Sequence, residues 1–177
     1  AATPPVESVF GADDRIRVGD TTGFPWSAIG QMTVTGASAG LRATGVMIGP
    51  QHMLTAGHAV LDPDLGGDGM AEAIRVEFGK GGTPELDLVA EMVEARVLPD
   101  WAASFDRDAD FALVTLDRSI GAATGWFETF AIDYDGFFTG LTVNVAGYPA
   151  DLAGGEALHL STGPVAESTA SRLFYAG

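Results

Sequence analysis

Cysteine is absent from all 177 residues of the sequence. This absence excludes disulfide bonds, thiolate nucleophiles and cysteine-ligated zinc together, so the folded state must depend on packing and hydrogen bonds. Long hydrophobic runs are also missing. The longest uncharged stretch, residues 21–41, is rich in Gly, Thr and Ser and contains Pro25, whereas a membrane-spanning helix needs about 20 apolar residues. We therefore predict no transmembrane helix.

Basic residues are scarce. Nine Lys and Arg stand against 24 Asp and Glu, which gives a formal net charge of -15. A chain with this charge repels phosphate groups, so nucleic acids and anionic membrane surfaces are not expected as partners. The first residues carry neither the basic nor the apolar region of an intact signal peptide, and we expect them to be a processed end.

Helical periodicity is also scarce, and short β-rich runs separated by Gly, Pro and Asp recur through the chain, which indicates a sandwich or barrel. Helical turns are expected only at 58–61 and 126–130. With 46% hydrophobic residues, the chain can bury a core. The predicted fold class is all-β and mostly antiparallel. The expected strands are residues 28–35, 42–48, 73–78, 88–98, 111–116, 141–146, 157–165 and 172–175.

Segment 120–124, which contains Gly and Ala, is predicted to be a loop that divides the chain. By strand counting, about six strands precede it and about three follow it. The second set is too small to close a barrel, and an edge strand at 172–175 would expose apolar side chains and unpaired backbone groups. We therefore expect further structure to continue beyond this edge.

His58 follows an apolar, strand-like stretch and ends the run Thr-Ala-Gly-His at 55–58. The small residues before it let the backbone turn tightly, which would present the imidazole at a strand end and not inside the core. A general base requires this placement. The alternative is a structural histidine held by hydrogen bonds.

Asp110 directly precedes the apolar run 111–114, so its carboxylate would be half-buried and would need a donor to offset desolvation. His58 can be this donor. An aspartate that accepts a hydrogen bond from one ring nitrogen leaves the other nitrogen free to take a proton from a hydroxyl. Asp106 and Asp108 are nearby competitors that fit turn or cap positions, whereas Asp110 adjoins the strand.

These residues resemble the trypsin-like (chymotrypsin-fold) serine proteases, whose catalytic residues follow the chain order His, Asp, Ser. The resemblance is strongest to bacterial glutamyl endopeptidases and covers nearly the whole chain from Ser8. It implies a two-barrel fold whose second barrel is incomplete in this chain, with His58 as general base and Asp110 as its orienting partner. The further segments that carry the resemblance are 8–15, 20–25, 47–50, 147–151 and 161–165.

The Gly-x-Ser-Gly motif, which supplies the nucleophile and the oxyanion hole in that family, is absent. The later segment that lines a pocket for an acidic side chain is absent as well, so a preference for Glu or Asp is implied by the resemblance alone. The four candidate serines have no comparable context and are interpreted as surface residues of loops or strands. They are Ser104, Ser161, Ser168 and Ser171.

The acidic loop 62–69 spaces Asp62, Asp64 and Asp68 so that it could bind calcium, which takes oxygen ligands. It lacks a closing Glu at EF-hand spacing, so a solvated acidic turn is the preferred interpretation. His52 and His159 have no ligand-spaced partners. We predict no metal and no other cofactor.

The sequence thus predicts a secreted serine endopeptidase, extracellular or periplasmic, that acts on protein or peptide substrates. The serine is expected on a complementary C-terminal fragment or on sequence missing after Gly177, and this chain alone is expected to be inactive. Residues 1–7 are predicted to be a pro-segment remnant or a flexible N-terminus, 8–120 the first barrel and 121–177 part of the second. The alternatives are a non-catalytic protease-like domain that binds protein and an acidic calcium-binding β module.

Overall fold

The computed structural model describes residues 13–129, 132, 134, 136–169 and 171–175. The predicted pro-segment 1–7 and the chain end at Gly177 lie outside the described residues. Contacts divide the chain into two compact units. The barrel unit contains Arg17–Phe130 and Ala146–His159, and the second unit contains Ala1–Ile16, Ala131–Val145 and Leu160–Gly177.

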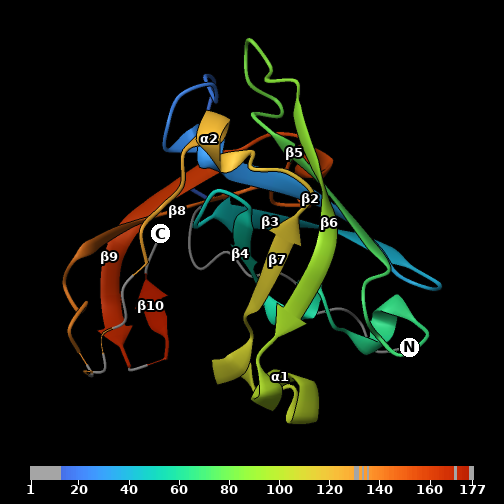
Figure 1. Ribbon diagram of the computed structural model, residues 1–177. Helices are drawn as coiled ribbons and strands as arrows, with labels where there is room; N and C mark the ends of the chain where they lie inside the picture. Colours follow the sequence, from blue (N-terminus) through green and yellow to red (C-terminus); the bar gives the residue numbers. More distant parts are fainter. Residues whose placement is uncertain (1–12, 130–131, 133, 135, 170, 176–177) are drawn as a thin grey trace. The chain divides into compact units, whose positions relative to one another are not determined.

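Six strands of the barrel unit form a closed antiparallel barrel (Figure 1). Their order around the barrel is β2-β3-β4-β7-β6-β5. The predicted all-β class and the first barrel are therefore confirmed. The strands are β2 (Ile29–Thr35), β3 (Gly40–Met47), β4 (His52–Thr55), β5 (Ala73–Phe78), β6 (Leu88–Val97) and β7 (Ala112–Leu116).

Alternation of side chains along each strand fills the barrel interior. In β7, Ala112, Val114 and Leu116 are buried, and the residues between them are more exposed. Since successive side chains of a strand point to opposite faces, every second residue of this strand enters the core. Gly45 of β3 is required by close packing, because a Cβ at this position would overlap the Sδ atom of Met53.

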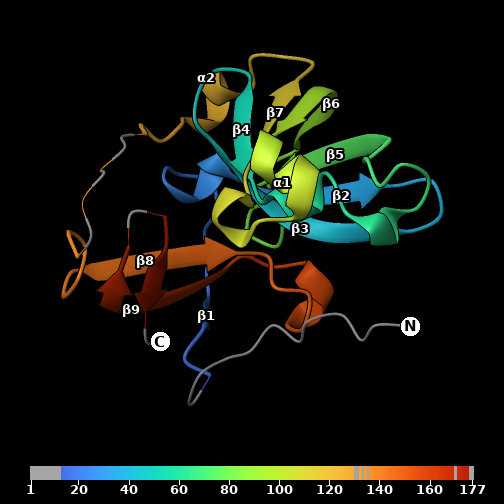
Figure 2. The same cartoon turned by 90° about the horizontal axis from the view of Figure 1, so that it is seen from below.

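Short helices connect the strands. In Figure 2, which views the molecule from below, α1 lies at the near end of the barrel. The α-helices are α1 (Pro99–Ser104) and α2 (Gly121–Thr124), and the 3-10 helices are η1 (Trp26–Ala28), η2 (Gly57–Ala59), η3 (Pro63–Leu65), η4 (Arg107–Ala109) and η5 (Ala153–Gly155). Among the described residues, no helix reaches the length and apolarity that a bilayer crossing requires.

Two predictions about helices are wrong. The expected loop at 120–124 contains α2, whose two central alanines have high helix propensity. The expected helical segment at 126–130 is not helical over its described residues 126–129. The helical turn expected at 58–61 is present as η2, shifted by one residue at its start. Helix α1 was not expected; it begins with a proline, which is favoured in the first turn because its fixed φ suits a helix.

The remaining strands form a four-stranded sheet in which β9 pairs with β1, β8 and β10. Their bounds are β1 (Ile16–Arg17), β8 (Thr142–Gly147), β9 (His159–Ser168) and β10 (Leu173–Tyr175). Strand β10 is an edge strand in the described part of the chain. The second barrel is therefore partial.

Candidate active site

His58 and Asp110 meet because of the pairing between β4 and β7. Thr55, the last residue of β4, pairs with Ala112, the first residue of β7. The chain leaves β4 through an extended residue, Ala56, and enters the tight turn η2, which contains His58. Asp110 comes two residues before β7. The apolar alternation that sets this register therefore also brings the two polar side chains together.

Asp110 holds His58 at two points. Its Oδ1 accepts the backbone N–H of His58 at 2.8 Å, and its Oδ2 lies 2.8 Å from the ring atom Nδ1. A carboxylate partner selects the tautomer that carries its proton on Nδ1, which leaves Nε2 as an acceptor. Nε2 makes no hydrogen bond within the described residues, and the His58 side chain is 54% exposed. The arrangement can accept a proton from a group that approaches Nε2.

Asp106, one of the two competing aspartates, has the capping role expected of it. It is the N-cap of η4, and its Oδ1 accepts the backbone N–H of Asp108 at 3.0 Å. The carboxylate that bonds His58 is that of Asp110. The sequence motifs did not point to the nearby Trp101. It is 6% exposed, and its ring centroid lies 6.4 Å from that of His58.

Two known proteases resemble this chain in sequence. The chain is 32% identical over 171 residues to the glutamyl endopeptidase of Bacillus licheniformis, covering 97% of this chain and 51% of that protein. It is 27% identical over 170 residues to the extracellular metalloprotease of Bacillus subtilis, covering 95% and 53%. The chain thus spans about half the length of these relatives. No family model matches the chain.

Among solved structures, a Glu endopeptidase in complex with MPD superposes with a TM-score of 0.75 at 22% identity, over 95% of this chain and 80% of that one. The protease Anisep from Arthrobacter nicotinovorans gives a TM-score of 0.68 at 16% identity, over 85% and 68%. The chain is similar to a glutamyl endopeptidase over about half of that protein, and it has the chymotrypsin-like fold of these solved proteases. The resemblance inferred from the motifs is therefore confirmed as a likeness in sequence and in fold.

The four candidate serines have hydrogen bonds of their own. Ser104 Oγ donates to the carbonyl of Asp100 at 3.0 Å. The interpretation of all four as surface residues is wrong for two of them, since Ser161 and Ser168 are 8% and 4% exposed. They are buried because they lie on β9 and their hydroxyls satisfy polar groups of the second unit: Ser161 donates to Asp14, and Ser168 accepts the Phe138 N–H.

The acidic loop 62–69 uses its carboxylates to hold its own backbone. Asp62 caps η3, and its Oδ1 accepts the Asp64 N–H at 2.8 Å. Asp68 Oδ1 accepts the Met70 N–H at 3.0 Å. Aspartates in turns favour such local bonds. Across the described part of the chain, no group of three or more His, Cys, Asp or Glu is arranged to hold a metal ion.

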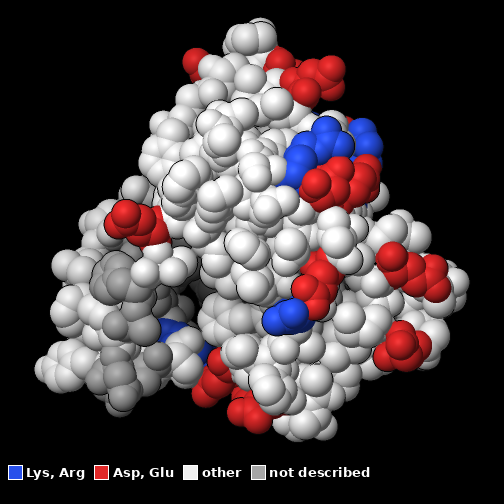
Figure 3. Space-filling model, viewed as in Figure 1, with Lys and Arg blue, Asp and Glu red and all other residues white. Residues whose placement is uncertain are grey.

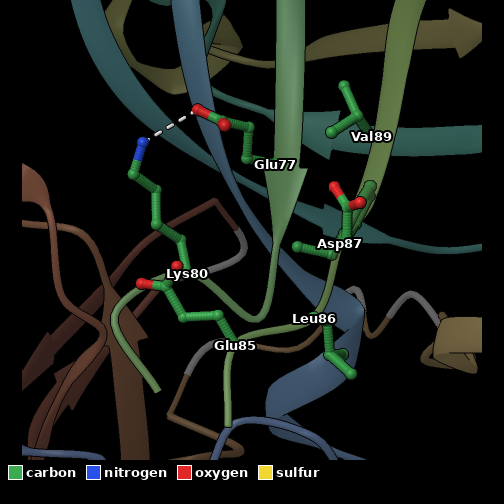
Figure 4. Close-up of a pocket in the computed structure, with 7 residues that line it drawn as sticks. Glu77, Lys80, Glu85, Leu86, Asp87 and Val89 are labelled. Atoms are coloured by element: carbon green, nitrogen blue, oxygen red, sulfur yellow. Dashed lines mark hydrogen bonds and ion pairs between the residues drawn. The ribbon is translucent and has the colours of Figure 1, made fainter. Parts of the chain in front are cut away.

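Lys80 lines a pocket of about 270 Å³ at the hairpin between β5 and β6 (Figure 4). Its Nζ lies 2.9 Å from Glu77 Oε2 and 3.1 Å from Glu156 Oε2. The pocket walls also carry Glu85 and Asp87, but neither His58 nor Asp110 lines it. On the face in Figure 3, basic side chains lie beside acidic ones. Five basic residues of the barrel unit form ion pairs: Arg42, Arg75, Lys80, Arg96 and Arg118.

Proposed function

We propose that this chain supplies the base and the orienting carboxylate of a serine endopeptidase, and that the nucleophilic serine lies outside these 177 residues. The observation that carries the proposal is the two-point hold of Asp110 on His58, at 2.8 Å for each contact. A structural histidine needs no exposed ring nitrogen, whereas a general base does. The 54% exposure of the His58 side chain fits the second role.

In the proposed reaction, His58 moves a proton in each of two stages. His58 Nε2 takes the proton of the serine hydroxyl as the oxygen attacks the peptide carbonyl, and then gives it to the leaving amine. Asp110 keeps the proton on Nδ1 and stabilises the imidazolium that forms between the two stages. Backbone N–H groups that stabilise the oxyanion would accompany the serine on the completing sequence.

The proposed substrate class is supported by the name of one relative. We propose cleavage after Glu or Asp, because the Bacillus licheniformis relative is a glutamyl endopeptidase. The same preference would release residues 1–7, since Glu7 precedes Ser8. Secretion is proposed on the name of the Bacillus subtilis relative, an extracellular protease. Peptides that differ only in Glu, Asp or Gln before the scissile bond measure the preference, and N-terminal sequencing after incubation measures the release.

The exposed edge of the second unit supports a complementary C-terminal segment. Leu173, Phe174 and Tyr175 of β10 are 45%, 46% and 38% exposed. An apolar edge strand is a site for pairing with a further strand. Intact mass of the purified protein would reveal a segment that co-purifies. A homogeneous 18.3 kDa species, folded and monomeric, would contradict this part of the proposal and favour the non-catalytic binding domain.

Substitution of the base tests the proposal directly. His58→Ala, made in the protein together with the segment that supplies the serine, should reduce kcat by at least about a thousandfold, because triad members act as a unit. His52→Ala is the matched control, since His52 lies on β4 and is exposed. It should leave kcat unchanged. Undiminished turnover in His58→Ala would remove His58 from the mechanism.

A further inference from the structure

We infer that Trp101 is a positioning residue for the His58–Asp110 pair. The inference rests on the proposed function, because it concerns how that pair is held in place. Trp101 lies in α1, between β6 and β7, and only 6% of it is exposed. It contacts the turn that carries His58 at both ends, so a change in its side chain is transmitted to the imidazole.

The first contact is with Gly57, the residue before His58. A Cβ on Gly57 would lie 2.9 Å from Trp101 Cδ1 and 3.0 Å from Cγ, which is closer than side chains tolerate. The same Cβ would lie 3.0 Å from Asp110 Oδ1. Gly57 is therefore enclosed between the indole and the carboxylate. The φ of Gly57 is not in the left-handed region, so it is space and not backbone conformation that demands glycine here.

The second contact is at the far end of the same turn. Trp101 Nε1–H donates to the carbonyl of Leu61 at 3.0 Å. The backbone N–H of Leu61 in turn donates to the carbonyl of Gly57 at 2.8 Å. The indole thus packs on the start of the turn and bonds to its end. His58 lies between these points, with its ring tilted by 60° to the indole.

Trp101 is itself fixed by the end of α1. Phe105 caps the helix in the left-handed conformation, at φ 54°, and its N–H donates to the Trp101 carbonyl at 2.9 Å. The Phe105 ring meets the indole edge-on at 5.2 Å. This geometry is favourable for aromatic pairs. The end of α1 therefore holds Trp101 in place, and Trp101 in turn contacts the turn that carries His58.

The test uses the protein together with the segment that supplies the serine. Trp101→Phe keeps an aromatic ring but removes the Nε1–H donor and part of the indole's volume, whereas Trp101→Ala removes the whole contact. We expect kcat to fall about tenfold in Trp101→Phe and further in Trp101→Ala, with KM within about twofold of the wild-type value, because orientation of the base affects the transition state and not ground-state binding. Trp126→Phe is the control, since Trp126 is 43% exposed; it should change neither constant.

A second readout does not depend on turnover. In the NMR spectrum, exchange of the His58 Nδ1 proton with water should become at least tenfold faster in Trp101→Phe, while the signals of His52 and His159 stay in place. If the proposed function fails and no activity is found, this signal still tests the role of Trp101. Trp101 variants that lower the Tm while the His58 proton exchanges at the wild-type rate would show a merely structural residue and overturn the inference.

A substitution of Gly57 tests the same contact from the side of the turn. Gly57→Ala should produce the same fall in kcat, because the new methyl group displaces the indole. In the double variant Gly57→Ala, Trp101→Ala, the methyl group enters space that the indole has left, so the combined loss should be smaller than the product of the two single losses. A fully multiplicative loss would mean that the two residues act separately, and would contradict the inference.

Discussion

The strands of the barrel close into a complete ring, whereas the four-stranded sheet is open and ends in edge strands. Around the barrel, every strand has a partner on both sides, and side chains such as Phe78 and Met32 are fully buried. In the sheet, β10 ends the described strands with Phe174 and Tyr175 exposed. The His58–Asp110 pair belongs to the barrel. One self-contained barrel therefore holds the His58–Asp110 pair in position. Under the proposed function, the nucleophile would come from sequence that completes the four-stranded sheet.

Among changes to the barrel, the largest loss of activity is expected from a change at the carboxylate of Asp110. Asp110→Asn keeps the size of the side chain but allows an amide N–H to face Nδ1, so the imidazole adopts the wrong tautomer. We expect kcat to fall by about 10⁴, as tautomer reversal does in serine proteases. The measurement is steady-state kinetics on a peptide substrate, made in the protein together with the segment that supplies the serine.

The matched control for this variant is Asp106→Asn, at the carboxylate that caps η4. It should change stability slightly and leave kcat unchanged. An equal loss of activity in both variants would mean that the loop before β7, and not the contact of Asp110 with His58, controls the reaction.

The next largest effect is expected from truncation of a large side chain, which should destabilise the barrel much more than the four-stranded sheet. Phe78→Ala, in the barrel, should lower the free energy of unfolding by about 3–5 kcal/mol, because it leaves a cavity. Phe174→Ala, on the exposed edge strand, should change it by less than about 0.5 kcal/mol. Urea denaturation of the 177-residue chain measures both. A loss at Phe174 as large as that at Phe78 would mean that β10 is already buried in solution.

Most of the barrel could be predicted from the sequence, because its strands alternate apolar and polar residues. Strand β5 occupies the expected residues, and β2 differs by one. Strand β1 could not be predicted, since two residues carry no periodic signal. Helix α2 was mistaken for a loop because its four residues are too few to show helical periodicity.

The histidine and aspartate of the candidate site could also be predicted, since each adjoins an apolar strand. The contacts of Trp101 could not. They join Trp101 to Gly57 and Leu61 across the fold, and no local pattern marks such a contact. The one local signal was Gly57 itself, whose missing side chain leaves room for the indole. The burial of Ser161 and Ser168 was missed because it depends on the packing of β9 within its own unit.

A smaller, pH-dependent effect tests whether segment 146–159 is part of the barrel unit. Tyr148 is 3% exposed, and burial raises the pKa of its phenol above the usual 10.0. The folded chain then keeps a proton that the unfolded chain loses, so this stabilisation is complete below about pH 10 and declines at higher pH, by at most about 1.4 kcal/mol per pH unit. Tyr148→Phe should remove that decline, and Tyr134→Phe, at a site that is 66% exposed, should not. Identical pH profiles for wild type and Tyr148→Phe would place the phenol in solvent.

The smallest effects are expected in the acidic loop of the barrel unit, where two roles for the same aspartates predict different results. If Asp62 acts as the cap of η3, Asp62→Ala should lower the free energy of unfolding by about 1 kcal/mol. Asp64→Ala should cost less, because only the backbone N–H of Asp64 takes part in the cap. Neither loss should depend on calcium, since the carboxylate of Asp62 is satisfied by that N–H. Thermal unfolding with added calcium and then with a chelator decides between the roles. A calcium-dependent rise in Tm that Asp62→Ala abolishes would establish the loop as a calcium site and show that the barrel, too, needs a component from outside its own strands.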